Sequence, residues 1–451
     1  MNHATPPSAI PRRRFLETTT AAVTAFTVIP RHVLGGTQFV PPSEKINIAI
    51  VGAGGQGRTN MRELFKFPDA QIVAVADPIE RENLDAYYFK GEAGRLPVKA
   101  EAEKRYSAAT PNFKVADYED FRIMLEKEKA IDAVLCATPD HLHTPPILAA
   151  IKRGAHVVAE KPLALTLADA REIIAKSRGA GTVVAVDMHK RYDSFLRSAF
   201  VDVVPRLGDL LYGRAVLEEP LRVSTSVFKW AEHSNPFSYV GVHWTDLFAH
   251  YLKVRPVSLY AVGQKKLLAG WRDEYHPNGI NTFDALQVSV QYDNGLNVQY
   301  VNAWINPEEF EGAVNQEMEI VGSLGRVFVD QQDRGMRSTI IGDGSRTHNP
   351  HFQAEVPSAG RTGTCSCIGY CKDSLVAGLD AAARVALGLA DRAAIAGTYP
   401  DAESALSCVA ILEAAAKVAA ANHEYRARGQ GMPVSARFKG DDFEIVEPKH
   451  V

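Results

Sequence analysis

The sequence has few cysteines and no excess of positive charge. Its 451 residues include five cysteines, an odd number scattered over a large chain, whereas disulfide-stabilised domains are short and rich in paired cysteines. The formal net charge is -3, which is opposite in sign to that of a typical nucleic-acid binder. These absences exclude a disulfide framework, and we do not expect a nucleic-acid partner.

Long hydrophobic runs, repeats and low-complexity segments are also missing. The composition, 46% hydrophobic and 23% charged, is that of an average folded chain, which excludes a disordered, collagen-like or multi-pass membrane protein. A chain of 451 residues is too long for one ordinary domain of about 100–200 residues. We expect two domains with additional segments.

The first 40 residues have the order of an export signal. Three arginines, Arg12 to Arg14, precede Phe15 and Leu16, and residues 18–29 are uncharged; such a run is too short to span a bilayer, which needs about 20 residues. The segment resembles a twin-arginine signal, with a simple amphipathic leader as the alternative. We expect residues 1–40 to be a signal and linker that directs the protein through the twin-arginine machinery to the periplasm. No clear cleavage site follows Ile29, so a retained signal would tether the protein to the membrane.

A glycine-rich turn follows the first strand pattern. Residues 46–51 form a short apolar run, and a G-x-G-x-x-G segment and a helical pattern come next. Gly52 suits a tight turn, Gly54 allows a pyrophosphate to approach the backbone, and Gly57 allows close packing of helix on strand. We therefore expect this turn to contact a dinucleotide through Gly52, Gly54, Gly55, Gln56 and Gly57.

Asp77 indicates which dinucleotide the glycine turn binds. It ends a second strand pattern, residues 72–76, and lies 20 residues beyond Gly57, where such folds place the carboxylate that binds the adenosine ribose. A carboxylate there would repel a 2′-phosphate. The sequence predicts NAD rather than NADP as cofactor, and the alternative for Asp77 is an ordinary turn residue.

Strand and helix patterns alternate up to about residue 160. Helices are expected at 118–128 and 145–153, strands at 132–137 and 156–159, and an inserted helix with a loop at 80–111. This alternation predicts an α/β fold with a doubly wound parallel sheet, the Rossmann arrangement. We place this NAD-binding domain at residues 45–165.

Two segments at the ends of the later strands carry a family resemblance. They are Thr138-Pro139-Asp140-His141-Leu142-His143 and Glu160-Lys161-Pro162. The chain here resembles the Gfo/Idh/MocA family, which includes glucose–fructose oxidoreductase and inositol dehydrogenase. The resemblance implies that both segments flank the nicotinamide and that Lys161 assists catalysis. The further cofactor contacts that it implies are Thr138, Pro139, Asp140, His143, Glu160 and Lys161.

Two further segments resemble this family's substrate site. Arg191 and Tyr192 match an Arg-(Phe/Tyr) pair near the substrate, and residues 241–250 look like the family's glycine-rich D-x-x-x-H helix. This helix departs from the pattern because it has a single glycine and an additional histidine, His243. We expect Arg191, Tyr192 and His243 to contact substrate.

His243, Asp246 and His250 are spaced i, i+3, i+7, so they share one face of that helix. A metal site, acid–base catalysis and a structural hydrogen-bonded stripe are all compatible with this pattern. We favour acid–base catalysis without a metal, because removal of hydride from a carbinol carbon requires loss of the hydroxyl proton. Lys161, Asp246 and His250 are the expected catalytic residues: His250 as base, Lys161 polarising the oxygen, and Asp246 orienting His250 or a hydroxyl.

Beyond residue 205 the patterns become strand-rich. Strands are expected at 213–219, 257–262, 283–292 and 296–304, with tight hairpins at 293–295 and 323–325. Helices at 373–387 and 402–421 should close a C-terminal α+β domain, residues 166–440, built on a large, mostly antiparallel sheet. We expect this domain to bind substrate and to form a homo-oligomer. Cys365, Cys367 and Cys371 lack a recognisable fourth ligand, so we expect a loop of free thiols rather than a metal or cluster site.

Three functions remain open from the sequence. The first is an exported NAD-dependent oxidoreductase acting on a CH–OH group of a sugar, polyol or related carbohydrate. The second is a glycosidase that oxidises its sugar transiently with tightly held NAD. The third, a non-catalytic binding protein, is disfavoured because Lys161, Asp246 and His250 are all present.

Overall fold

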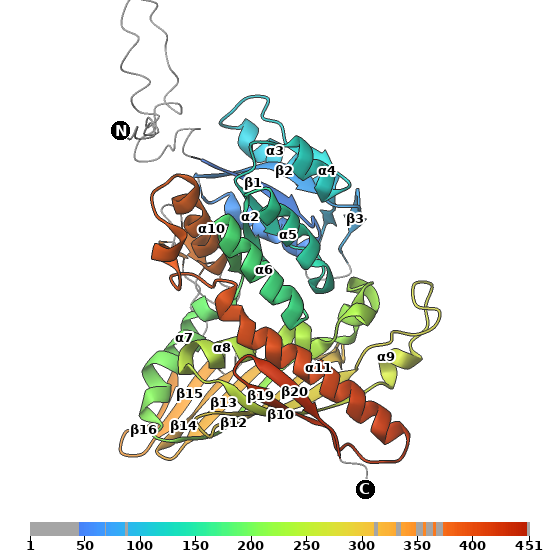
Figure 1. Ribbon diagram of the computed structural model, residues 1–451, viewed down its shortest axis with the longest axis vertical. Coiled ribbons are helices and arrows are strands. Elements are labelled where there is room, and N and C mark those ends of the chain that lie inside the picture. Colours follow the sequence, from blue (N-terminus) through green and yellow to red (C-terminus); the bar gives the residue numbers. More distant parts are fainter. Residues whose placement is uncertain are drawn as a thin grey trace, which may run out of the picture. The chain divides into compact units, whose positions relative to one another are not determined.

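The computed structural model describes residues 45–448 except 68, 86–88, 311–313, 331–334, 349–354, 358–363 and 367–372. The predicted export signal lies outside these residues, as do Cys367, Cys371 and the side chain of Cys365. The described chain contains two large β-sheets with helices packed on them (Figure 1).

The first sheet has six parallel strands and is buried on both faces. In spatial order they are β5 (Ala116–Tyr118), β2 (Ala70–Ala76), β1 (Ile46–Val51), β6 (Ala133–Cys136), β7 (His156–Ala159) and β8 (Val184–Val186). Along β1, Ile48 and Ile50 enter one hydrophobic core while Ala49 and Val51 enter another. A strand that is apolar on both faces is typical of a parallel sheet covered by helices on both sides.

Three helices cover each face of this sheet. One face carries α2 (Gly55–Leu64), α3 (Arg95–Ser107) and α10 (Asp373–Ala386), and the other carries α4 (Phe121–Lys127), α5 (Thr144–Lys152) and α6 (Leu167–Ala180). The insertion after β2 also forms a small hairpin of β3 (Glu82–Asn83) and β4 (Glu92–Ala93). The doubly wound parallel sheet predicted from the sequence is confirmed.

Two expectations about this layer need correction. The sheet continues past residue 165, because β8 pairs with β7. Helix α10, expected to close the C-terminal domain, packs instead on the first sheet: a Cβ at Gly378 would lie 2.6 Å from the Cβ of Ala185. An amphipathic pattern identifies the buried face of a helix but not the sheet that it contacts.

The second sheet has ten strands. Adjacent strands in it run antiparallel, except for the pair β9 and β12, which runs parallel. In spatial order they are β16 (Gly344–His348), β15 (Gly335–Ile340), β14 (Gly325–Asp330), β13 (Asn315–Gly322), β9 (Leu210–Pro220), β12 (Asn297–Asn306), β11 (Ala285–Tyr292), β10 (Pro256–Gln264), β19 (Ser435–Lys439) and β20 (Asp442–Val446). In β11, Leu286 and Val288 are buried while Gln287 and Gln291 are exposed. This alternation covers one face and leaves the other open, and both expected hairpins are present.

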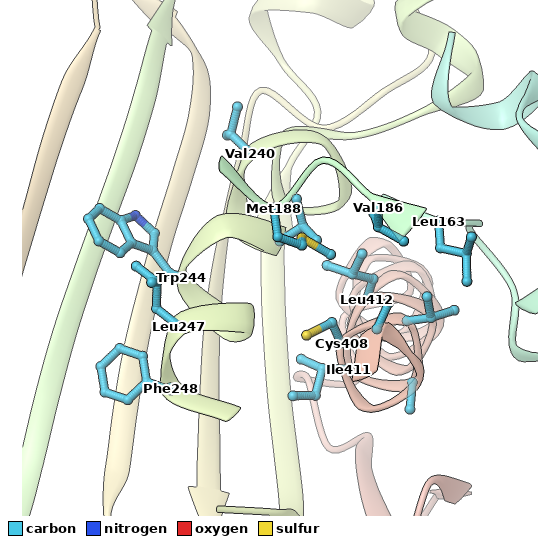
Figure 2. Close-up of a cluster of buried hydrophobic side chains, with 14 of the residues drawn as sticks. Leu163, Val186, Met188, Val240, Trp244, Leu247, Phe248, Cys408, Ile411 and Leu412 are labelled. Carbon is cyan, nitrogen blue, oxygen red and sulfur yellow. The ribbon is translucent and has the colours of Figure 1, made fainter. Parts of the chain in front are cut away.

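The covered face of the second sheet carries α8 (Val242–Leu252), which packs against α11 (Leu406–Ala427). Figure 2 shows Trp244, Leu247 and Phe248 of α8 pointing toward the strands, with Cys408 on the side of α11. The indole Nε1 of Trp244 donates to the Val216 carbonyl at 3.0 Å. The apolar content of α11 would suffice for a membrane span by composition, but 56% of that stretch is buried in the protein, as in a core helix.

The remaining elements are short. They are α7 (Ser194–Ser198), α9 (Leu267–Gly270), and a two-stranded sheet of β17 (Glu355–Pro357) and β18 (Thr364–Ser366).

Candidate active site

The glycine turn between β1 and α2 has the backbone geometry that its sequence predicts. Gly52 has φ +92°, and a Cβ there would lie 2.5 Å from the Ala137 carbonyl. A Cβ at Gly57 would lie 2.0 Å from the Gly52 oxygen, whereas no atom lies within 4 Å of a Cβ built on Gly54. Packing therefore requires glycine at positions 52 and 57, whereas Gly54 leaves open space beside the backbone.

Asp77 lies at the end of the adjacent strand β2 and is held by the same turn. Its Oδ2 accepts from the Ala53 amide at 2.6 Å and its Oδ1 from the Ile79 amide at 2.7 Å. Burial raises the pKa of Asp77, opposed by these two hydrogen bonds. Open backbone at Gly54, the N-terminus of α2 and a carboxylate at the end of β2 fit a dinucleotide. The turn from Gly54 to Gln56 would hold the pyrophosphate and Asp77 the ribose.

The two other cofactor segments meet at the carboxyl ends of β6 and β7. The ring nitrogens of His143 lie 2.6 Å from the Pro162 carbonyl oxygen and 2.9 Å from that of Thr138, so one imidazole joins both segments. Glu160 is buried, and its Oε1 accepts from Asn60 of α2 at 2.7 Å. Asp140 is hydrogen-bonded to Ser234. The structure thus brings Thr138, Asp140, His143 and Glu160 to one edge of the sheet, although their contacts with a cofactor stay predictions.

Lys161 is the buried cation at this edge. Lys161 is 6% exposed. Its Nζ donates to the Tyr239 carbonyl at 2.7 Å and lies 3.8 Å from the centroid of the Tyr239 ring. Burial lowers the pKa of Lys161, while the nearby carboxylates Glu160 and Glu219 raise it. A desolvated ammonium group beside a predicted nicotinamide site is suited to polarising an oxygen atom.

Of the two histidines on α8, the structure brings His243 and not His250 to Lys161. The His243 ring lies 4.5 Å from that of His189, and its pKa is held well below the usual value by burial, with His189 and Lys161 adding to the effect. Seven residues along a helix correspond to about 10 Å, so His250 lies about two turns further along α8, where burial lowers its pKa to about 4 and the nearby charges are those of Arg191 and Asp246. The spacing i, i+7 gives a shared helix face, but it also separates the two histidines along the helix axis.

Asp246, expected to orient His250 or a hydroxyl, is paired with Arg191 in the structure. Both of its carboxylate oxygens accept from Arg191, Oδ2 from Nε at 2.7 Å and Oδ1 from Nη2 at 2.5 Å, and the pair is buried with 6% and 2% of the two side chains exposed. The structure therefore pairs Asp246 with Arg191, and among the described residues His250 donates no hydrogen bond to Asp246. Tyr192 is partly buried against the core under α10. Arg191 and Asp246 form a buried ion pair, and the substrate contact expected for Arg191 and the catalytic role expected for Asp246 stay predictions.

Metal binding was one alternative for the stripe on α8. In the part of the chain that the structure describes, no group of three or more His, Cys, Asp or Glu side chains is arranged to hold a metal ion.

Glu219 and Tyr239 also lie near Lys161 and were not expected at the site. Glu219 is the next-to-last residue of β9 and is 4% exposed. Burial raises its pKa to about 7, although Lys161 opposes this shift. The available signal was a pair of carboxylates, Glu218 and Glu219, that ends an apolar strand before Pro220. The contact of Tyr239 with Lys161 bridges 78 residues of sequence, so no local pattern indicates it.

Curated relatives match parts of this chain. Inositol 2-dehydrogenase of Rubrobacter xylanophilus is 31% identical over 153 residues, 34% of this chain and 37% of that protein. A glycosyl hydrolase family 109 protein of Stenotrophomonas maltophilia is 29% identical over 175 residues, 39% of this chain and 34% of that protein. The matched part of the chain thus spans about a third of the length of these relatives.

A solved structure shows the same fold over a longer stretch. The inositol dehydrogenase homologue of Azotobacter vinelandii, crystallised with NADH and myo-inositol, has a TM-score of 0.60 at 19% identity and covers 83% of this chain and 96% of that one.

Two family models match the chain in sequence order. Residues 46–188 match the NAD-binding Rossmann fold of the GFO_IDH_MocA oxidoreductase family, and residues 205–328 match the GFO/IDH/MocA C-terminal domain. The two matches together cover more than half of the 451 residues and correspond to the two sheets described above. The chain therefore belongs to the Gfo/Idh/MocA family of oxidoreductases, with that family's NAD-binding domain followed by its C-terminal domain.

Proposed function

We propose that this protein is an NAD-dependent oxidoreductase that acts on a CH–OH group of a sugar or polyol. The observation that carries the proposal is the buried Lys161, held by Tyr239 between the two cofactor segments and the second sheet. NAD supplies a hydride acceptor when it is bound. The family relationship and the myo-inositol complex of the Azotobacter homologue support a polyhydroxylated substrate.

The residues around Lys161 divide the remaining work. The Lys161 ammonium stabilises negative charge on the substrate oxygen. His243 is neutral near pH 7, since burial depresses its pKa, and within the described residues its Nδ1 has no hydrogen-bond partner. We therefore assign to His243 the proton-accepting role that the sequence pattern gave to His250.

The test uses the purified full chain. Denatured protein is analysed by mass spectrometry for released NAD, and native protein is incubated with NAD and a panel of inositols, free aldoses and glucosides while NADH absorbance is followed. We expect NADH formation with at least one substrate, lost in Lys161→Ala and retained in a matched surface variant, Lys176→Ala. A protein that neither contains nor binds NAD, and forms no NADH with any panel member, would refute the proposal.

A second candidate is a glycosidase that oxidises its sugar transiently. The match to the family 109 glycosyl hydrolase favours it. Release of aglycone over many turnovers, without added NAD and without net NADH, would support this candidate. Net NADH from a free sugar would support the first.

We also propose that the protein is exported and assembles through the open face of its large sheet. Arg12 and Arg13 precede the uncharged segment of the expected signal, and the sheet exposes Leu211, Tyr212 and Tyr260. Replacing both arginines by lysine should retain the protein in the cytoplasm on fractionation. Light scattering should give a mass above the 49.2 kDa of one chain, and a monomer would contradict assembly through the sheet.

A further inference from the structure

Glu219 is a buried carboxyl group that the proposed reaction does not yet use. It lies at the end of β9, next to the parallel strand β12 that carries Trp304. Its Oε2 accepts from the Trp304 indole Nε1 at 2.9 Å, and its other oxygen makes no hydrogen bond to the described residues. A carboxyl group that is 4% exposed and half satisfied is costly unless it has an electrostatic partner.

Lys161 is the cation whose charge acts on Glu219, although no ion pair within 4.0 Å joins the two groups among the described residues. The Lys161 Nζ lies 3.8 Å from the centroid of the Tyr239 ring, which lies 6.0 Å from the Trp304 ring that holds Glu219. The electrostatic effect is mutual: Lys161 lowers the pKa of Glu219, and Glu219 raises the pKa of Lys161. One continuous set of contacts therefore connects the end of the large sheet to the lysine of the first domain.

Other charged groups around Lys161 come from different elements. Glu160, Asp140 and Asp187 contribute negative charge, and each already accepts a hydrogen bond from a neutral side chain, from Asn60, Ser234 and Ser374 respectively. The charge of Lys161 lowers the pKa of both Lys190 and His243, in addition to the larger effect of burial. Of the four carboxylates, Glu219 is the one supplied by the large sheet.

We propose that Glu219 is a positioning residue that acts through Lys161, keeping it in the ammonium form that polarises the substrate oxygen. The catalytic consequence rests on the proposed function, whereas the charge pair itself does not. Burial alone favours the neutral amine, and the Glu219 carboxylate opposes this preference. Burial raises the pKa of Glu219 to about 7, and the charge of Lys161 opposes this shift.

The first experiment measures the Lys161 pKa directly, without substrate or cofactor. Full-length protein with 13C-labelled lysine is titrated by NMR, and the Lys161 signal is assigned by its loss in Lys161→Arg. In Glu219→Gln, whose amide oxygen can still accept from Trp304, we expect the Lys161 pKa to fall by about one unit or more. Glu218→Gln is the matched control, because Glu218 is the neighbouring residue of β9 and bonds to Asn315 at 2.9 Å. An unchanged Lys161 pKa in folded Glu219→Gln would overturn the inference.

The second experiment measures kcat/KM against pH. Glu219→Gln should move the alkaline limb to lower pH by the shift found by NMR, Glu219→Asp should partly restore it, and NAD affinity should stay unchanged. A profile that is scaled down without a shift would show a merely structural role and overturn the positioning proposal. If the NMR shift is found but the wild type forms no NADH with any substrate, the charge pair stands and the proposed function fails.

Discussion

The ion pair between Arg191 and Asp246 predicts how an Asp246→Asn variant should behave. The two side chains are bidentate, with distances of 2.7 and 2.5 Å, and both are buried. The asparagine keeps the shape of the side chain but leaves the Arg191 guanidinium without its counter-charge. We therefore expect loss of stability and not loss of chemistry, because Lys161 lies in a different set of contacts.

The size of this loss follows from burial. Removing one partner of a buried ion pair costs about 3–5 kcal/mol, because the other charge stays desolvated. Unfolding entropy is about 2.1 cal/mol/K per residue, or about 0.8 kcal/mol/K for a unit of about 400 residues that unfolds cooperatively. The unfolding temperature of Asp246→Asn should therefore fall by about 4–6 °C.

The assay is differential scanning calorimetry together with turnover well below the unfolding temperature. Asp442→Asn is the control, because Asp442 pairs with Arg171 at 2.7 Å but both side chains are exposed, by 69% and 45%. A surface pair of this kind contributes at most about 1 kcal/mol, so the control should shift by at most about 1 °C. An Asp246→Asn protein with unchanged unfolding temperature and a hundredfold lower kcat would refute the argument and return Asp246 to the catalytic group.

Lys161→Ala and His243→Ala should each reduce kcat/KM by about a hundredfold or more with NAD affinity retained, whereas His250→Ala should stay within a few-fold; the opposite order for the two histidines would restore the sequence-based assignment. Asp77→Ala should reduce the ratio of NAD affinity to NADP affinity by about tenfold or more in calorimetric titrations, because the carboxylate that opposes a 2′-phosphate is removed. Equal affinities for NAD and NADP in the wild type would contradict this prediction. His156 has a pKa lowered to about 4 by burial, against about 6.5 when unfolded, so its contribution is complete above pH 6.5 and is lost as pH falls toward 4. The free energy of unfolding measured in urea should fall by up to about 3 kcal/mol over this pH range. The fall should be smaller in His156→Gln, and an identical pH dependence in the variant would refute this role of His156.

The fold was predictable where local pattern determines it. The strand, glycine turn and helix from residue 46 to 64, and the hairpin at 293–295, depend on neighbours in sequence, and the structure has them in place. The first domain's end was not predictable in this way. β8 joins the parallel sheet, and α10 packs on it, through contacts between residues far apart in the chain.

The candidate active site also has a part that local sequence pattern predicts and a part that it does not. The glycine turn and Asp77 are separated by one strand and one helix, so their spacing in sequence predicts their proximity in space. Helical periodicity placed His243 and His250 on one face but could not say which turn of α8 meets Lys161. The partners of Lys161, Tyr239 and Glu219, come from a different domain, and their contacts depend on docking rather than on local pattern.

The attachment of α10 to the first sheet affects how the chain can fold during synthesis. β8 ends at residue 186, but the Val186 amide donates to the Pro400 carbonyl at 2.8 Å and the Ala402 amide to the Val184 carbonyl at 3.0 Å. About 200 residues must therefore be translated before this edge is covered, which takes about 10–40 s at 5–20 residues per second. During that interval the nascent chain exposes an unpaired strand edge and an apolar sheet face. The NAD-binding half is begun first, but its edge is covered only after most of the large sheet has been translated, so a ribosome that stalls in that sheet would leave it open to chaperones and proteases.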